Sequence, residues 1–146
     1  MDKIYKAGAR EYGIPISQLT SKKLLVVEDN LALLKLLESI LREVGYETVV
    51  ATTGIEAIEM ISHNKFDLAV IDYGLPDALG TEIAVRFQTL NPGAKILFIT
   101  GKSDQLTRAL ITSDKILMTW QVLEKPFLAS VFIVRIEQML SNKLHI

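Results

Sequence analysis

The chain has 146 residues, of which 49% are hydrophobic and 23% charged, which is enough for one domain with a substantial core. Its net charge of -1 gives no electrostatic reason to expect binding to nucleic acid or to acidic membranes. The absence of cysteine excludes disulfides, thiolate metal sites and cysteine nucleophiles. No apolar run approaches the roughly 20 residues that span a bilayer, and the N-terminus lacks a signal-peptide core, so we expect a cytoplasmic protein.

The first 21 residues stand apart from the alternating strand and helix patterns that begin at Lys23. We therefore expect an N-terminal extension over 1–21 and one domain over 22–146. The stretch Asp2–Tyr12 favours a short amphipathic helix, which Gly13 and Pro15 would end. The sequence leaves open whether this extension is a partly ordered tail or a helix used for docking or dimerisation.

From Lys23 onward, strand-like and helix-like patterns alternate five times. Leu24–Val27 is an apolar run typical of a buried strand. Asn30 is suited to cap the next helix, whose leucines recur at three- and four-residue spacing, and Gly45 is suited to end it. The predicted strands are 24–27, 47–51, 68–71, 95–100 and 116–123, and the predicted helices are 31–44, 53–63, 80–90, 103–111 and 127–140.

Strands that alternate with helices through short connections predict a parallel sheet with right-handed crossovers and helices on both faces. The expected fold class is α/β, a flavodoxin-like, doubly wound (βα)5 sheet with strand order 2-1-3-4-5. Strands one and three are neighbours in that order. Glu28 and Asp29, which follow strand one, should therefore lie beside Asp72, which ends strand three.

The ends of the other strands add two polar groups to the same edge, Thr100 after strand four and Lys125 after strand five. Three crowded carboxylates repel one another at neutral pH, so a positive partner is expected among them. A hard dication with oxygen ligands, Mg²⁺ in a cell, suits the site. Such a site favours phosphoryl transfer, with Asp72 on the central strand as the carboxylate nucleophile.

Four motifs at these strand ends resemble those of a known family, the receiver domains of two-component response regulators (CheY-like). They are LLVVEDN over Leu24–Asn30, AVIDYGLPDALG over Ala69–Gly80, FITG over Phe98–Gly101 and LEKPF over Leu123–Phe127. Each motif is weak alone, but the four occur in order and at the expected strand ends. The resemblance covers roughly residues 22–140.

The resemblance implies that Asp72 accepts a phosphoryl group from a histidine kinase or a phosphotransfer protein and forms an acyl phosphate. It implies that Asp29, Asp72 and the backbone carbonyl of Gly74 coordinate Mg²⁺, and that Glu28 acts through a bound water.

For the other two strand ends, the resemblance implies that Thr100 hydrogen-bonds one phosphoryl oxygen and that Lys125 pairs with another. A cis peptide bond before Pro126 would aim the lysine. The phosphorylated domain would then switch a downstream protein target, with no direct binding to nucleic acid or membrane. A homodimer through the fourth helix, fifth strand and fifth helix is also compatible with the resemblance.

Three departures from the family pattern concern the output surface. Val122 stands where the family usually has Tyr or Phe, and Trp120 is a candidate substitute on the same strand face. Thr100 and Lys125 are about three residues further apart than usual in the family. The Gly-Ala turn that commonly precedes strand five is replaced by Ser113-Asp114-Lys115.

Other functions remain as alternatives. The domain could be a receiver fragment of a hybrid histidine kinase, or an interaction module that keeps the fold and signals without phosphate. A haloacid-dehalogenase-like phosphatase is disfavoured, because that chemistry needs a second acid where this chain has Gly74. A nucleotide-binding fold is disfavoured because no glycine-rich loop follows strand one. The leading hypothesis is a switch that catalyses its own phosphorylation and dephosphorylation, rather than a metabolic enzyme.

Overall fold

The computed structural model describes residues 22–78, 80–101 and 120–141. The helices predicted over Asp2–Tyr12 and 103–111, the turn Ser113-Asp114-Lys115 and the first part of the fifth predicted strand lie outside these residues. Within them, no helix is both long enough and apolar enough to cross a membrane.

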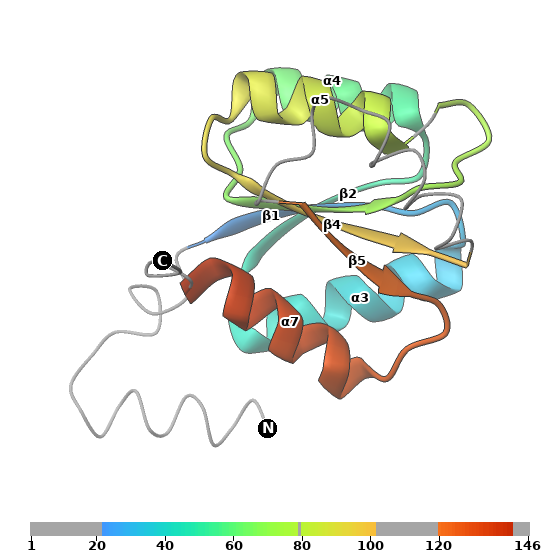
Figure 1. Ribbon diagram of the computed structural model, residues 1–146, viewed down its shortest axis with the longest axis vertical. Helices are drawn as coiled ribbons and strands as arrows, with labels where there is room; N and C mark the ends of the chain where they lie inside the picture. The colour runs from blue at the N-terminus through green and yellow to red at the C-terminus, as the bar shows by residue number, and fades with distance from the viewer. Residues whose placement is uncertain (1–21, 79, 102–119, 142–146) are drawn as a thin grey trace.

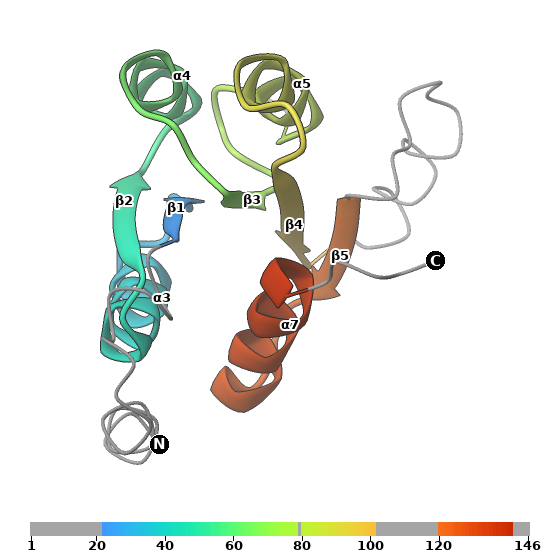
Figure 2. The same cartoon turned by 90° about the vertical axis from the view of Figure 1, so that its left-hand side faces the viewer.

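Five parallel strands form one sheet in the order β2-β1-β3-β4-β5, as predicted. The strands are β1 (Lys23–Val27), β2 (Glu47–Ala51), β3 (Leu68–Asp72), β4 (Lys95–Thr100) and β5 (Trp120–Glu124). The helices are α3 (Leu31–Val44), α4 (Gly54–His63), α5 (Gly80–Leu90) and α7 (Ala129–Ser141). Helices α4 and α5 cover one face of the sheet, and α3 and α7 cover the other (Figures 1 and 2).

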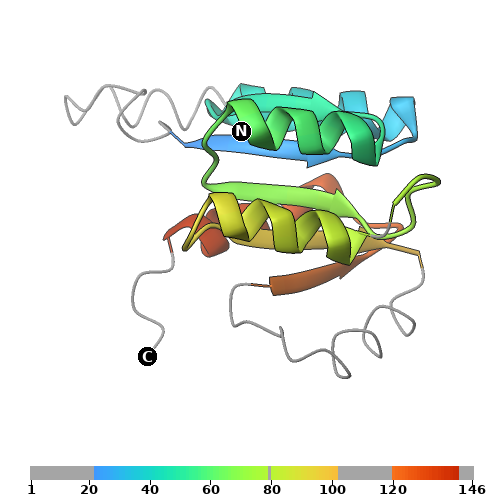
Figure 3. The same cartoon turned by 90° about the horizontal axis from the view of Figure 1, so that it is seen from above.

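The central strands are buried on both faces, which explains why their sequences are continuous apolar runs instead of alternating ones. Successive side chains point to opposite faces of the sheet. In β1, Leu25 and Val27 join the core under α4 and α5, whereas Leu24 and Val26 join the core under α3 and α7. Figure 3 shows α4 and α5 side by side over the parallel strands.

The predicted ends of α3 and α4 are confirmed by their caps. The side chain of Asn30 accepts a hydrogen bond from the backbone N–H of Leu33 at 3.0 Å. Gly45 ends α3 in a left-handed conformation (φ 112°), which costs glycine little. Thr53 caps α4 by accepting from the N–H of Glu56 at 3.1 Å.

The last helix begins later than predicted, at Ala129 instead of Phe127. Its first backbone hydrogen bond runs from the N–H of Phe132 to the carbonyl of Leu128 at 3.0 Å. Phe127 stacks on Phe132 with the ring centroids 5.7 Å apart. An apolar residue before the cap that packs on the helix in this way fixes the direction in which the chain enters the helix.

Only some of the apolar side chains of α7 are buried. Its buried side chains include Phe132, Ile133 and Ile136, whereas Val131 and Val134 are exposed. The helix contains more apolar residues than one buried face needs, so periodicity alone did not identify which of them point inward.

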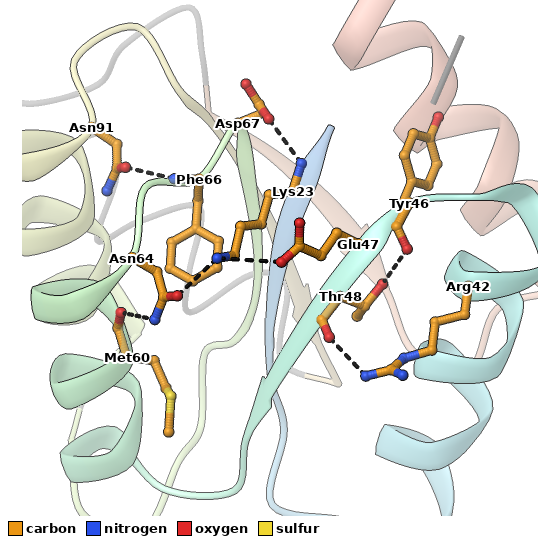
Figure 4. Close-up of polar contacts among 10 residues, drawn as sticks. All are labelled: Lys23, Arg42, Tyr46, Glu47, Thr48, Met60, Asn64, Phe66, Asp67 and Asn91. Carbon is orange, nitrogen blue, oxygen red and sulfur yellow. Dashed lines mark hydrogen bonds and ion pairs between the residues drawn. The ribbon is translucent and has the colours of Figure 1, made fainter. Parts of the chain in front are cut away.

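At the edge where the strands begin, Lys23 joins three segments of the chain (Figure 4). Its backbone N–H donates to Asp67 at 2.8 Å, and its ammonium donates to the side-chain oxygen of Asn64 at 2.8 Å. The ammonium also lies 3.4 Å from a carboxylate oxygen of Glu47 and 5.7 Å from the ring centroid of Phe66. These contacts hold β1, β2 and the segment before β3 together.

Candidate functional site at the carboxyl edge of the sheet

The strand register brings the predicted acidic residues together. Val27 of β1 is paired with Ile71 of β3, so the residues that follow each of them lie side by side. Glu28, Asp29 and Asp72 each place one carboxylate oxygen within 4.8 Å of the others. The prediction that strand order unites these three groups is confirmed.

Glu28 is fully buried, and both of its carboxylate oxygens are engaged. One oxygen accepts from the ammonium of Lys125 at 2.7 Å, and the other accepts from the backbone N–H of Asn30 at 3.0 Å. Burial raises the pKa of Glu28 above its ordinary value, and these two hydrogen bonds oppose that rise. Glu28 is therefore held in place by the protein on both sides of its carboxylate.

Asp72 ends the central strand with only 6% of its surface exposed. One of its oxygens accepts from the backbone N–H of Gly74 at 3.2 Å, and the other lies 3.6 Å from the ammonium of Lys125. Asp29, in contrast, is exposed. The cluster thus has a buried floor and one side that is open to solvent.

Thr100 and Lys125 reach the same edge from β4 and β5. Ile99 is the register partner of Asp72, so buried Thr100 lies one residue beyond it. The carbonyl of Thr100 accepts from the backbone N–H of Lys125 at 2.8 Å, which ties the two strand ends together. The peptide bond before Pro126 is cis, as the resemblance implied.

The donor atoms suit a hard divalent cation. All three side chains of the cluster offer carboxylate oxygens, and Asp29 faces solvent, where a cation can keep several of its waters. Gly74 is exposed beside Asp72 and follows it in the loop. Glu28 is fully buried and accepts a hydrogen bond at each oxygen, whereas Asp29 is exposed and only one oxygen of Asp72 accepts a hydrogen bond from the backbone, so Asp29 and Asp72 are the better placed of the acids for direct contact with a cation.

Trp120, the candidate substitute for the family's aromatic residue, shares a face of β5 with Val122 but does not share its position. Trp120 and Val122 both pack on the core under α4 and α5, so the predicted shared face is confirmed. Trp120 pairs with Ile96, four positions before Thr100, which is roughly 13 Å at the rise of a strand. Trp120 therefore does not occupy the place that Val122 takes beside the end of β4.

Trp120 is also held by other contacts at the start of β5. Its indole N–H donates to the side chain of Gln88 at 2.6 Å. Its ring meets Phe98 edge-on, with the centroids 5.4 Å apart and the planes at 81°. The indole thus links β5 to α5, a contact that the sequence did not indicate.

A further contact at the rim was not predicted. The carboxylate of Asp77, in the loop after β3, accepts from the backbone N–H groups of Gly54 and Ile55 at 2.8 and 3.1 Å. A Pro-Asp pair indicates a turn. No local pattern indicates that its carboxylate caps a helix that begins 23 residues earlier.

Comparison with known proteins agrees with the geometry. The family described as "Response regulator receiver domain" matches residues 24–137. The response regulator receiver protein CpdR of Brucella abortus is 31% identical over 119 residues, which cover 82% of this chain and 97% of CpdR. The transcriptional regulatory protein ZraR of Klebsiella oxytoca is 31% identical over 80 residues, but the chain spans only 18% of its length.

The fold is also found among solved structures. A CheY-like receiver domain protein from Methanospirillum hungatei superposes with a TM-score of 0.70 at 29% identity, covering 83% of this chain and 94% of that one. The receiver domain from the hybrid histidine kinase CckA superposes with a TM-score of 0.68 at 25% identity, covering 81% and 98%. The chain therefore belongs to the response regulator receiver family, whose members act in two-component signalling and are phosphorylated on an aspartate.

Proposed function

We propose that Asp72 is the phosphoryl acceptor of this receiver domain. The observation that carries the proposal is its setting: a nearly buried carboxylate at the end of the central strand, 3.6 Å from the ammonium of Lys125 and beside two further acids. A carboxylate oxygen of Asp72 would attack the phosphorus of a phosphohistidine. The P–N bond would break, the imidazole of the kinase or phosphotransfer protein would leave, and an acyl phosphate would remain.

The metal that this reaction needs is proposed to be Mg²⁺, held by Asp29, Asp72 and the backbone carbonyl of Gly74. Glu28 would act through a bound water, since its oxygens are already occupied by donors from Lys125 and Asn30. The ion would offset the negative charge of the carboxylates and of the transferring group.

Lys125 and Thr100 are proposed to receive the phosphoryl oxygens. The ammonium of Lys125 already lies between Glu28 and Asp72, and a small rotation of its flexible side chain would bring it to an oxygen on Asp72. Thr100 would donate a hydrogen bond from its hydroxyl to another phosphoryl oxygen. These two contacts exist only after phosphorylation, so they would favour the active state of the domain.

The wider role stays a set of predictions from the sequence. These are an extension over 1–21, a receiver domain over 22–146, a cytoplasmic location, a downstream protein target and a homodimer through the face that includes β5 and the last helix. The CckA structure shows that a receiver of this fold occurs inside a hybrid histidine kinase, so a place within a longer signalling protein is part of the proposal.

A direct test is incubation of the protein with Mg²⁺ and acetyl phosphate, followed by mass spectrometry of the intact chain. We expect the wild type to gain a phosphoryl group and Asp72→Asn to gain none. Asp67→Asn is the matched control, because it makes the same chemical change just before the start of β3, at the opposite edge of the sheet. Equal uptake by Asp72→Asn and the wild type would reject Asp72 as the acceptor.

One observation favours a second candidate, an interaction module that signals without phosphate. Val122 packs at the position where the family usually carries the aromatic residue of its switch. A wild-type protein that takes up no phosphoryl group under these conditions would support this alternative.

A further inference from the structure

The loop between β3 and α5 carries the proposed metal ligand Gly74 and is fastened at several points. At its base, the N–H of Gly80 donates to the carbonyl of Tyr73 at 3.2 Å, and the N–H of Tyr73 donates to Ile99 at 3.1 Å. In its first half, Leu75 is buried with 6% of its surface exposed. Beyond Leu75, Pro76 and Asp77 are exposed, and Ala78 is partly buried against the core under α4 and α5.

A further attachment is the carboxylate of Asp77. Its two oxygens accept separately from the N–H of Gly54 at 2.8 Å and from the N–H of Ile55 at 3.1 Å. The first N–H groups of a helix have no partner within the helix, and Thr53 satisfies only that of Glu56. A side chain from the loop thus completes the cap of α4.

One close approach indicates that this contact is tight, and two electrostatic effects favour the charged carboxylate. A Cβ atom built on Gly54 would lie 2.7 Å from the Cβ of Ala78 and 3.1 Å from an oxygen of Asp77, so the loop approaches α4 as closely as a glycine allows. A negative charge at the start of a helix is favoured by the helix dipole. The N–H of Gly54, and less strongly that of Ile55, lowers the pKa of Asp77 below its usual value.

We propose that Asp77 is a positioning residue for the phosphorylation site: by binding the loop to the start of α4, it holds Gly74 and its carbonyl in place beside Asp72 for Mg²⁺. The proposal rests on the proposed function, because it presupposes the metal site at Asp29, Asp72 and Gly74. Asp77 itself would not touch the ion. It would instead hold a metal ligand in the right orientation without binding the metal. Loss of residues with this role commonly weakens metal binding about tenfold or more.

The test compares three variants with the wild type by two measurements. The first is Mg²⁺ titration, and the second is amide hydrogen exchange of the metal-free protein, resolved by residue. For Asp77→Ala we expect faster exchange at Gly54, Ile55 and Gly74, and Mg²⁺ affinity weakened about tenfold. Asp77→Asn keeps one carbonyl oxygen as an acceptor, so its affinity should lie between those of the wild type and Asp77→Ala.

Thr53→Ala is the matched control, because it removes the other side-chain cap of α4 without touching the loop. It should speed exchange at Glu56 and leave Mg²⁺ affinity unchanged. The proposal is overturned if Asp77→Ala binds Mg²⁺ as tightly as the wild type, or if Thr53→Ala weakens binding equally, since the effect would then reflect only the stability of α4.

The failure of this proposal can be told from failure of the proposed function. If the wild type binds no Mg²⁺, both the proposed metal site and the positioning role of Asp77 are rejected, regardless of the amide hydrogen-exchange result. A wild type that binds Mg²⁺, together with unchanged exchange at Gly74 in Asp77→Ala, leaves the metal site intact and rejects the positioning role alone.

Discussion

Lys125 lies between two buried carboxylates, 2.7 Å from an oxygen of Glu28 and 3.6 Å from one of Asp72. Lys125→Met should leave those charges without their cation. We expect a loss of about 2 kcal/mol in the free energy of unfolding at neutral pH without Mg²⁺, less than for a fully buried pair because the lysine side chain is 26% exposed. Urea denaturation measures the loss, and saturating Mg²⁺ should reduce it by restoring positive charge.

The control for this prediction is Lys35→Met, which removes an exposed lysine from α3. It should change stability by less than about 0.5 kcal/mol and show no dependence on Mg²⁺ beyond that of the wild type. A Lys125→Met protein that is as stable as the wild type without Mg²⁺ would mean that Glu28 is protonated and neutral at this pH.

The grouping of the candidate site residues at one edge could be predicted from the sequence, because each one ends or follows an apolar run that is typical of a strand. Glu28, Asp72, Thr100 and Lys125 are then brought to one edge by the strand order alone. What could not be predicted is how Glu28 is held, since its burial and its two donors depend on side-chain packing. The role of Asp77 was missed because its partners lie on another element, far away in the chain.

At the scale of elements, the close contact between the start of α5 and the end of β3 sets a limit on substitution. A Cβ atom built on Gly80 would lie 2.9 Å from the Cα of Tyr73 and 3.1 Å from the carbonyl oxygen of Asp72, and both are backbone atoms that cannot rotate away. Gly80→Ala should therefore lower the free energy of unfolding by about 1–3 kcal/mol and slow phosphoryl uptake by displacing Asp72. Denaturation and uptake kinetics measure the two effects.

Gly74→Ala provides the comparison, because a Cβ atom built on Gly74 has no neighbour within 4 Å. The same change of residue type should there alter stability by less than about 0.5 kcal/mol. If Gly80→Ala proved as stable as Gly74→Ala, the contact between α5 and β3 would have to relax more easily than a backbone contact is expected to.

The elements that were predicted well are those with local end signals. Asn30, Gly45 and Thr53 cap helices through contacts within a few residues, which the sequence displays directly. The start of α7 was missed because Phe127 continues the apolar pattern but packs back on Phe132 outside the helix. Local pattern therefore predicts an element best where its boundary is set by local hydrogen bonds.

The whole molecule separates two polar clusters at opposite ends of the strands. The cluster around Lys23 joins segments where the strands begin, and the carboxylate cluster with Lys125 lies where they end (Figure 4 shows the first). Lys23 and Glu28 lie at opposite ends of β1, roughly 16 Å apart at the rise of a strand. One cluster can thus stabilise the sheet without entering the chemistry of the other.

Because the two clusters are far apart, the effects of substitutions in them on the free energy of unfolding should add. Lys23→Met removes a hydrogen bond to Asn64 at 2.8 Å and an ammonium 5.7 Å from the ring of Phe66, so we expect a loss of about 1–2 kcal/mol in stability. Phosphoryl uptake per folded molecule should be unchanged. In the double variant with Lys125→Met, the two losses should add within about 0.5 kcal/mol, because sites this far apart share no partner. Denaturation of the wild type, the two single variants and the double variant gives the coupling energy of this double-mutant cycle. A coupling energy well above that value would show that the two edges are energetically coupled through the sheet.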